Sequence, residues 1–191
     1  MKKLFFVCGS HCCGKTTVLK KLEDDGFISF NGSELGTDLF LAQKFITENQ
    51  NEDFELELAN LELERDIKIL DNIGVAGVET WHPGNLAYAA VRNPRIVSAL
   101  CEIAHKSPLI NNAFGVWLNI DTNVIRNRTK VFKDRVDWAC EFYEKVNSQM
   151  DNCLKMLGIR ERVEIIDANR PLEDVLFKVK DVIKRYTSHS I

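Results

Sequence analysis

The stretch from Gly9 to Thr17 reads GSHCCGKTT, so a histidine and two adjacent cysteines lie inside a glycine-rich loop. Residues 9–16 fit the pattern G-x-x-x-x-G-K-[ST], directly after an apolar run and directly before a helical segment. In such a loop the glycines allow a tight turn that points backbone N–H groups at phosphates, and the dipole of the following helix adds to the attraction. We therefore predict that a nucleotide is bound by residues Gly9, Ser10, His11, Cys12, Cys13, Gly14, Lys15, Thr16 and Thr17.

The last residues of the loop carry the charge and the hydroxyl that phosphate chemistry needs. Lys15 is expected to reach the β- and γ-phosphates of the nucleotide, and Thr16 to coordinate Mg²⁺ through its hydroxyl. The sequence therefore predicts ATP and Mg²⁺ as cofactors.

His11, Cys12 and Cys13 also raise the alternatives of a metal site and a redox site. A structural zinc site needs spacings such as C-x2-C with a second Cys or His pair elsewhere, and no such pair follows. A thiol beside Lys15 and a helix N-terminus could have a lowered pKa, so oxidation of Cys12 or Cys13 that blocks nucleotide binding is a further hypothesis.

A carboxylate and two aromatic residues follow the third apolar run, in the segment VAGVETWHPGNLAY. Glu79 is expected at the end of a strand beside the loop, where it can hold the hydration shell of Mg²⁺ or accept a proton from an attacking hydroxyl. A solvated glutamate at a strand end is the alternative. Trp81 and Tyr88 can line a base-stacking pocket or belong to the core.

The fourth apolar run leads into the one basic cluster of an otherwise acidic chain, NIDTNVIRNRTKVFKDRVD. Asp121 stands at the end of that run and is a further candidate ligand for Mg²⁺ beside Thr16 and Glu79. Residues 126–136 would form a lid that closes over the nucleotide. In it, Arg126, Arg128 and Arg135 would stabilise a transferring phosphoryl group. A solvated helix face explains the same charges without a lid.

Five short apolar runs alternate with longer helical segments along the chain. The runs predict strands at residues 4–8, 27–30, 75–80, 115–121 and 163–167. Helices are expected at residues 15–24, 38–48, 54–72, 86–91, 94–106, 134–157 and 171–186. Strands that alternate with long helices pair in parallel, so we predict an α/β three-layer sandwich with a five-stranded parallel sheet and helices on both faces. Ligands in such sheets bind beyond the carboxyl ends of the strands.

Apolar stripes on two of these helices indicate how they pack. The helix at 54–72 carries an apolar residue at every third or fourth position, which favours packing against the sheet. The stripe of the helix at 134–157, which includes Tyr143, is interpreted as core. The residues of the first stripe are Leu56, Ala59, Leu63, Ile67 and Leu70.

Composition excludes several classes of function. With 191 residues the chain is most simply one domain, 1–191, and its net charge of -3 argues against a nucleic-acid partner. No apolar run approaches the roughly 20 residues that span a bilayer, so no membrane partner is expected. The apolar stretch near the start is too short for a signal peptide, and the six scattered cysteines fit a reduced cytosol, so we predict a cytoplasmic protein.

The order of these features resembles the nucleoside monophosphate kinases, and most closely the thymidylate kinases, over nearly the whole chain. ETWHPGNLAY is similar to the segment D-R-Y-x-x-S-x-x-A-Y of that family, with Glu79 at the acidic position. FISFNGSELGTDL resembles its R-E-P-G-G-T loop, with Glu34 and Gly36 matching. VEIIDANRPLEDV resembles the ending V-x-x-I-D-A-x-x-P-x-E-x-V, and the segment from Asn119 onward resembles its arginine-bearing lid and the helix that follows.

The resemblance implies a fold of P-loop nucleotide-kinase type and a division of the site into two sides. On the ATP side, Ala168, Asn169 and Arg170 would flank the adenine. On the acceptor side, the substrate-binding residues would be His11, Glu34, Trp81 and Tyr88. Family members are often dimers, so the apolar stripe at 54–72 could instead serve a homodimer.

The chain departs from that family at two positions that bind the acceptor phosphate. Ser33 and Thr80 stand where the family carries arginines, which forfeits two charge-assisted contacts. We therefore predict an ATP- and Mg²⁺-dependent kinase that acts on a nucleotide, a nucleoside or another small-molecule acceptor. The alternative is a nucleotide-binding regulatory or scaffolding protein without acceptor phosphorylation. A GTPase is disfavoured because no N-K-x-D segment follows the fourth strand.

Overall fold

A five-stranded parallel sheet forms the centre of the protein. The computed structural model describes residues 3–37, 39, 52–128 and 135–188. The strands lie in the order β2-β3-β1-β4-β5. Their bounds are β1 Leu4–Cys8, β2 Phe30–Gly32, β3 Ala76–Glu79, β4 Ala113–Asn119 and β5 Val163–Asp167. The predicted strands are confirmed, although β2 begins only at Phe30, the last residue of the predicted range, and β4 begins two residues early.

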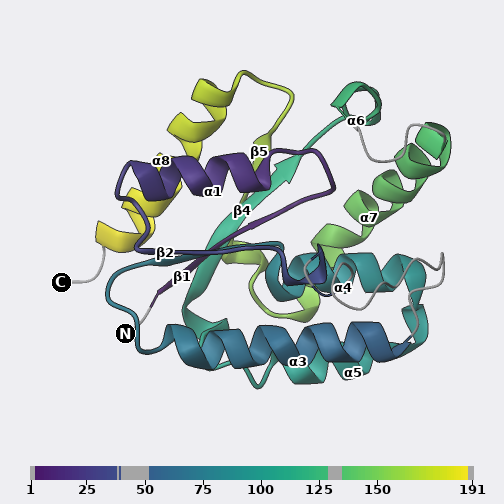
Figure 1. Cartoon of the computed structure of the whole chain (residues 1–191), viewed down its shortest axis with the longest axis horizontal. Coiled ribbons are helices and arrows are strands. Elements are labelled where there is room, and N and C mark those ends of the chain that lie inside the picture. Colours follow the sequence, from purple (N-terminus) through teal and green to yellow (C-terminus); the bar gives the residue numbers. More distant parts are fainter. Residues whose placement is uncertain (1–2, 38, 40–51, 129–134, 189–191) are drawn as a thin grey trace.

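Helices cover both faces of this sheet. Figure 1 shows α1 and α8 on one face and the helices α3, α4, α5 and α7 on the other, which confirms the predicted three-layer α/β sandwich. The helix bounds are α1 Lys15–Asp24, α3 Glu52–Ile69, α4 Trp81–Arg92, α5 Val97–Ala104, α6 Thr122–Arg128, α7 Val136–Met156 and α8 Leu172–Ser188. The helix predicted at 38–48 lies, apart from Leu39, outside the described residues. None of the helices in the described ranges is long and apolar enough to cross a membrane.

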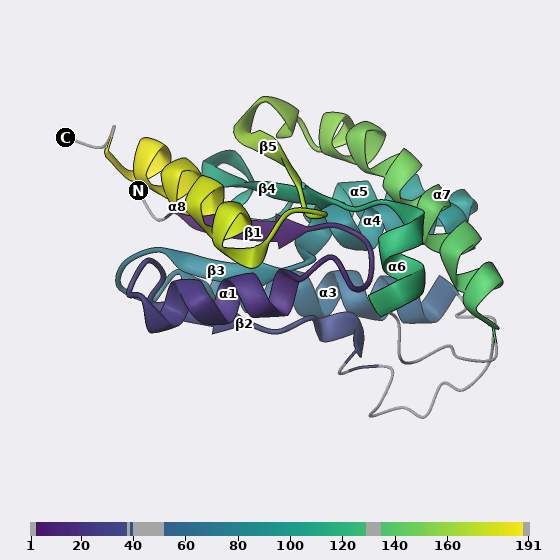
Figure 2. The same cartoon turned by 90° about the horizontal axis from the view of Figure 1, so that it is seen from above.

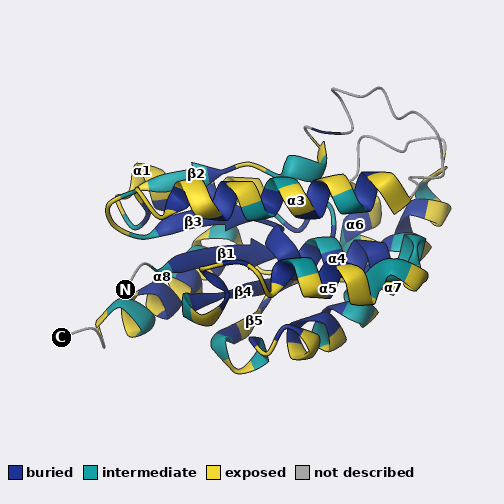
Figure 3. Cartoon of the chain, turned by 90° about the horizontal axis from the view of Figure 1, so that it is seen from below, coloured by how far each residue is buried: buried dark blue, intermediate teal, exposed yellow. Residues whose placement is uncertain are grey.

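Burial on both faces explains why the first strand is a continuous apolar run. All five residues of β1, LFFVC, are buried, as expected for the central strand of a parallel sheet covered by helices on both sides. Figure 3 shows the strands as the dark, buried layer beneath the partly exposed helices α3, α5 and α7. The hydrophobic core therefore lies on both faces of the sheet.

The register of the sheet brings the functional segments to one edge. Val7 is opposite Glu79 in β3, and Cys8 is opposite Trp117 in β4. Asn119 is opposite Asp167 in β5. Because all strands run in the same direction, the segments that follow them leave the sheet at this edge, as Figure 2 shows for the loop between β1 and α1.

A glycine in the sheet allows the ring of Phe6 to lie flat across the neighbouring strand. A Cβ at Gly115 would come within 2.4 Å of the Phe6 carbonyl oxygen and 2.8 Å of its ring. We expect Gly115→Ala to lower the free energy of unfolding by about 2–3 kcal/mol, because the clash is with backbone and β1 and β4 would have to shift. Gly158→Ala is the control: its Cβ meets no heavy atom within 4 Å, and only its φ of +66° costs about 1 kcal/mol. Urea unfolding measures both, and equal losses would contradict this packing argument.

The packing predicted for the helix at 54–72 is wrong in one respect. Ile67 and Leu70, which belong to the predicted apolar stripe, are 55% and 44% exposed. The helix instead buries a face that mixes apolar and charged residues, because the charged ones find partners on neighbouring elements. The buried residues of α3 are Phe54, Glu55, Leu58, Ala59, Glu62, Arg65, Asp66 and Ile69.

Candidate functional site

The glycine loop makes the tight turn that its sequence predicts. Gly9 has φ +143° and Gly14 has φ +101°, both in the region that favours glycine. A Cβ on Gly9 would come within 2.5 Å of the Leu118 carbonyl oxygen, so the loop passes close to β4. Gly14 is the N-cap of α1, and no side chain caps the first turn of that helix. The N–H groups of this turn are therefore available to an anion.

Lys15 and two carboxylates meet at the start of α1. The Lys15 side chain is 4% exposed, and its Nζ lies 3.8 Å from both Glu34 Oε2 and Glu79 Oε1. The same Nζ donates a hydrogen bond of 3.3 Å to the Ser10 carbonyl oxygen. The Thr16 hydroxyl donates to the two carboxylate oxygens of Glu79 over 3.1 and 2.9 Å. The fold thus brings together four of the predicted functional side chains from three segments that are distant in sequence.

Burial and charge act in opposite directions in this group. Burial raises the pKa of Glu79, Lys15 lowers it, Glu34 raises it, and the net result is a pKa above the ordinary value. Burial works against the charged form of Lys15, but Glu34 and the other negative groups around it outweigh burial and hold the pKa of Lys15 well above its ordinary value. The lysine therefore stays charged, while Glu79 binds a proton more readily than a solvated glutamate.

The raised pKa of Glu79 leads to a testable pH dependence. Because folded Glu79 binds its proton more tightly than the unfolded chain does, the resulting stabilisation is complete below the ordinary carboxyl pKa of about 4.5 and is lost as the pH rises through the raised value. We expect the free energy of unfolding of the wild type to fall relative to that of Glu79→Gln over this range. Urea unfolding at a series of pH values measures the difference, and two parallel profiles would contradict the raised pKa.

The structure argues against a reactive thiol at Cys13 and gives no support to a metal site in the loop. Burial raises the pKa of Cys13, although Lys15 lowers it, so the predicted lowering of the thiol pKa is wrong for Cys13. Cys13 is 3% exposed and packs into the core, whereas Cys12 is half-buried. No three His, Cys, Asp or Glu side chains of the described residues gather closely enough to hold a metal by themselves, and the zinc alternative finds no support there.

Aromatic rings from the loop, α4 and α7 lie beside the Lys15 group, which consists of Lys15, Glu34 and Glu79. The His11 ring stacks on Tyr143 at a centroid distance of 5.5 Å, and Tyr88 meets Tyr143 edge-on at 6.4 Å. Burial lowers the pKa of His11, and Lys15 lowers it further. Burial also raises the pKa of Tyr88, which is 8% exposed. The Arg92 guanidinium lies 5.3 Å above the Tyr88 ring. Periodicity assigned Tyr143 to the core, and Arg92 carried no signal in the sequence.

The structure does not place Trp81 in a ligand site. Trp81 is 0% exposed and packs on Phe6 at a ring distance of 5.0 Å, so the alternative of a core residue holds. Its Nε1 donates to Asp66 over 3.0 Å. Thr80 and Trp81 have φ values of 64° and 53°, an unfavourable backbone for residues other than glycine. The strained turn lies directly after Glu79 and fixes where β3 ends.

The Asp66 carboxylate of α3 contacts the residues of this turn. In addition to Trp81, the fully buried Asp66 carboxylate lies 3.1 Å from His82 Nε2 and accepts a hydrogen bond from the Ser107 hydroxyl. Arg65, the residue before Asp66, donates to the Ser33 carbonyl oxygen over 2.7 Å, directly before Glu34. The charged face of α3 therefore supports the segments of both carboxylates that meet Lys15.

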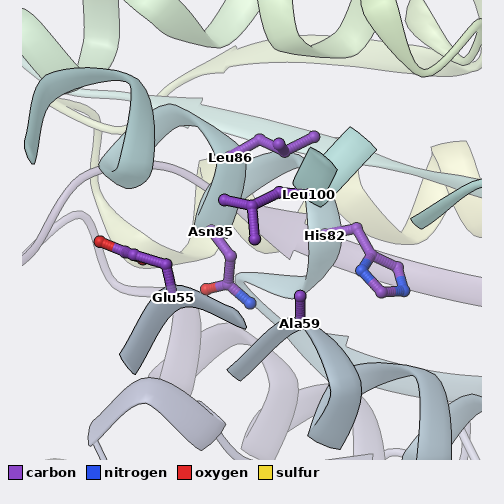
Figure 4. A pocket seen from close by; sticks show the side chains of 6 residues that line it. All are labelled: Glu55, Ala59, His82, Asn85, Leu86 and Leu100. Atoms are coloured by element: carbon purple, nitrogen blue, oxygen red, sulfur yellow. The ribbon is translucent and has the colours of Figure 1, made fainter. Parts of the chain in front are cut away.

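A cavity of about 10 Å³ lies between α3, α4 and α5, where the polar side chains leave the packing incomplete. In Figure 4 the side chain of Asn85 points toward α3 between Glu55 and Ala59. The Asn85 amide donates to Glu62 over 3.0 Å. A space of this size holds about one water molecule. The lining residues are Glu55, Ala59, His82, Asn85, Leu86 and Leu100.

The basic residues divide into two groups in the structure. Arg128 lies beside the loop, where its Nη1 is 3.5 Å from the Cys12 carbonyl oxygen and 3.4 Å from that of Ala168. Arg126 is exposed and forms an ion pair of 2.6 Å with Asp137, which ties the end of α6 to the start of α7. Arg135 is the exposed N-cap residue of α7. Residues 129–134 of the predicted lid lie outside the described residues.

The segment after β5 reaches the loop through Arg128. The Ala168 N–H donates to the Asn119 carbonyl oxygen over 2.7 Å. Asn169 accepts a hydrogen bond from the Asp121 N–H over 3.0 Å, and Arg170 pairs with Asp167 at 3.2 Å. Within the described part of the chain, no hydrogen bond or ion pair joins the Asp121 carboxylate to Thr16 or Glu79, so the assignment of Asp121 as a third Mg²⁺ ligand stays a prediction.

Comparison with protein-family patterns gives no match, and comparison with curated protein sequences gives none either. Solved structures do match. NadR protein in complex with NAD and AMP-PNP has a TM-score of 0.70 at 16% identity over 100% of this chain and 51% of that one, so this chain spans about half its length. Thymidylate kinase from Candida albicans has a TM-score of 0.69 at 16% identity over 99% and 94% of the two chains.

A third match is YorR protein from Bacillus subtilis in complex with phosphorylated GDP, with a TM-score of 0.58 at 18% identity over 99% of this chain and 100% of that one. Such low identity shows the fold alone. The fold of this chain is therefore similar to that of P-loop kinases, as the resemblance of its motifs implied.

Proposed function

We propose that this protein is an ATP- and Mg²⁺-dependent phosphotransferase of nucleotide-kinase type that acts on a small-molecule acceptor. The observation that carries the proposal is the meeting of Lys15, Thr16, Glu34 and Glu79 at the phosphate-binding loop. AMP-PNP is bound in the similar NadR structure, which supports ATP as the donor. The acceptor is a nucleotide, a nucleoside or another small molecule.

The loop supplies the contacts to the donor phosphates. N–H groups of the loop and of the first turn of α1 would bind the phosphate oxygens, and Lys15 would turn from the carboxylates toward the β- and γ-phosphates. The buried Ser10 hydroxyl, which has no hydrogen-bond partner among the described residues, is a further donor in the loop. Arg128, whose guanidinium lies beside both Cys12 and Ala168, would hold the loop against the segment around Asn169 and Arg170 that flanks the adenine.

Thr16 and Glu79 fit the needs of Mg²⁺. Their side-chain oxygens lie 2.9 Å apart in this structure, and Mg²⁺ in kinases is held by few protein oxygens together with phosphate oxygens and water. When bound, the ion would neutralise charge that develops on the phosphates. Asp121 has a smaller part in this proposal because, within the described residues, its carboxylate makes no hydrogen bond with these two side chains.

Glu79 would also position the acceptor. Its carboxylate lies at the end of β3 beside Lys15, where it can accept the proton of a hydroxyl that attacks the γ-phosphorus. Arg126 and Arg135 would add positive charge from the lid region at 126–136. The chain thus offers a phosphate cradle, a cation and a general base within one group of side chains.

The experiment is a transfer assay with γ-labelled ATP, Mg²⁺ and a panel of nucleosides, nucleotides and small metabolites. We expect label to move to at least one acceptor, and we expect Lys15→Met to abolish this transfer. Lys20→Met, which removes an exposed lysine from the same helix, is the control. If only slow hydrolysis of ATP occurs with every candidate, the transfer proposal fails.

The second candidate function is a nucleotide-binding regulatory or scaffolding protein. It is favoured by the acceptor side, where Ser33 is exposed, Thr80 is fully buried, and neither offers a guanidinium. This candidate predicts tight ATP binding without transfer. A thermal shift with ATP against GTP also separates both candidates from a GTPase.

A homodimer is the remaining part of the proposal. The exposed side chains of Ile67 on α3 and of Leu70 directly after it would be buried in such an interface. Sedimentation at several protein concentrations tests it, and a species with the monomer mass of 21.8 kDa at every concentration would count against a dimer.

A further inference from the structure

The geometry around Lys15 points to the class of acceptor: we propose that it is an unphosphorylated alcohol that carries an aromatic or heteroaromatic ring, as a nucleoside does. This inference rests on the proposed phosphotransferase function. It assigns the carboxylates Glu34 and Glu79 to the hydroxyl end of the acceptor. It assigns Tyr88, Tyr143 and His11 to the ring end.

The charge at the hydroxyl end disfavours an acceptor that already carries a phosphate. Glu34 and Glu79 both lie within 3.8 Å of the Lys15 ammonium, so two carboxylates share one cation. Once Lys15 turns to the phosphates of ATP, Glu34 loses that partner, while the Mg²⁺ that Thr16 and Glu79 would hold is shared with the ATP phosphates. A phosphomonoester brings nearly two negative charges and would be repelled by Glu34 at close range. A neutral hydroxyl group, in contrast, can donate its hydrogen bond to either carboxylate.

Arg92, whose guanidinium lies over the Tyr88 ring, is already engaged with other side chains of the described residues. Arg92 donates to both carboxylate oxygens of Glu55, over 2.8 Å from Nε and 3.1 Å from Nη2. Its guanidinium also lies over the rings of Tyr88 and Phe54, at 5.3 and 5.8 Å. Releasing it to bind an acceptor phosphate would leave the buried Glu55 carboxylate without its ion pair. Arg92 therefore fixes the orientation of Tyr88 and is not available as a phosphate ligand.

The ring end is a continuous row of aromatic side chains. Trp138, which is 50% exposed, stacks on Phe142 at 5.5 Å with an angle of 12° between the rings. Phe142 contacts both Tyr88 and Tyr143, and Tyr143 stacks on His11 in the loop. The row leads from the surface of α7 to the residue four positions before Lys15. Aromatic faces of this kind bind planar rings by stacking, with little dependence on the ring's substituents.

The two ends together define the transfer step. The hydroxyl oxygen of the acceptor forms a bond to the γ-phosphorus of ATP, while the bond between that phosphorus and the β,γ-bridging oxygen breaks and ADP leaves. The hydroxyl proton passes to the Glu79 carboxylate. The products are the phosphate ester of the alcohol, ADP and one proton, so the step needs no further reactant.

Matched pairs of acceptors test this inference. The whole chain, with saturating ATP and Mg²⁺, is given adenosine or AMP, cytidine or CMP, uridine or UMP, and thymidine or dTMP. We expect kcat/KM for the best nucleoside to exceed that for its own 5′-monophosphate by at least about tenfold. A preference for the monophosphate would overturn this inference and leave the proposed function intact. If no label moves to any of these compounds, and none moves to any member of the wider panel, both this inference and the proposed function are overturned.

Variants separate the two ends of the site. We expect Glu34→Gln to lower the ratio of kcat/KM for the nucleoside to kcat/KM for its monophosphate by several-fold, because one charge that repels the phosphate is removed. Tyr143→Leu is expected to raise KM for the nucleoside by about tenfold, while Tyr143→Phe restores it. Tyr186→Leu is the control, because it removes a ring that stacks on Phe114 at 4.7 Å, away from the loop. An unchanged preference in Glu34→Gln, or equal effects of the two leucine variants on KM, would contradict the assignment.

Discussion

Replacing Glu79 by glutamine is expected to slow phosphoryl transfer by about 10²–10⁴-fold, because the side chain loses the ability to accept the proton of the acceptor hydroxyl. The Thr16 hydroxyl and Lys15 both contact the Glu79 carboxylate in this structure. The amide retains one oxygen for the Thr16 hydroxyl, so the fold around the loop should persist. The effect should therefore appear in kcat with a smaller change in the KM for ATP. Rapid-quench transfer with labelled ATP measures it.

A matched variant distinguishes this loss from a general effect of charge. Glu64→Gln removes an exposed carboxylate of α3 and should leave the transfer rate unchanged. If Glu79→Gln retained the wild-type rate, the carboxylate at the end of β3 would have no part in proton transfer, and the role assigned to it would be wrong.

Removing Asp66 is expected to have the largest effect on stability. Asp66→Ala leaves Trp81 Nε1, the His82 ring and the Ser107 hydroxyl without the buried carboxylate that they contact. Loss of one member of a buried, hydrogen-bonded polar group costs about 3–5 kcal/mol. We expect the free energy of unfolding, measured by urea denaturation, to fall by this amount.

The control for this variant lies at the end of the same helix. Asp71→Ala changes an exposed aspartate and should alter the free energy of unfolding by no more than about 0.5 kcal/mol. A loss of less than about 1 kcal/mol in Asp66→Ala would contradict the view that Asp66 fixes the strained turn after Glu79.

The sheet and its loop could be predicted because local sequence determines them. Alternation of short apolar runs with helices predicted five parallel strands, and the spacing of Gly9, Gly14, Lys15 and Thr16 predicted the loop. The position of Glu79 beside Lys15 followed from the rule that parallel strands end at one edge of a sheet. The position of β2 at Phe30–Gly32 was harder to predict, because Phe30 and Asn31 are partly exposed and the strand carries little apolar pattern.

Long-range polar packing could not be predicted in the same way. Apolar periodicity placed Ile67 and Leu70 in the buried face of α3, whereas the helix buries Glu62, Arg65 and Asp66 instead. Charged residues are buried only when partners exist, and those partners come from the segment after β2, from α4 and from the segment after α5. No local pattern in α3 records them. A buried Asp that contacts a Trp and a His fifteen and sixteen residues later is visible only in the fold.

The contacts of the aromatic residues could not be predicted from local sequence either. From the sequence, Trp81 and Tyr88 could each line a base-stacking pocket or belong to the core. In the structure Trp81 is fully buried in the core, whereas Tyr88 lies near Lys15. Tyr143 joined an apolar stripe and was assigned to the core, which is confirmed by its burial, but the stripe did not show that it also stacks on His11 of the loop. Helix α7 must be packed in place before that contact exists.

The central claim is that the loop around Lys15 binds ATP, and calorimetric titration with a non-hydrolysable ATP analogue tests it most directly. We expect one site in the wild type, tighter binding with Mg²⁺ than without it, and an affinity at least about tenfold lower in Lys15→Met, because a charge-assisted contact to the phosphates is lost. Lys20→Met should bind as the wild type does. Absence of saturable binding, or equal affinity in Lys15→Met and the wild type, would contradict the account.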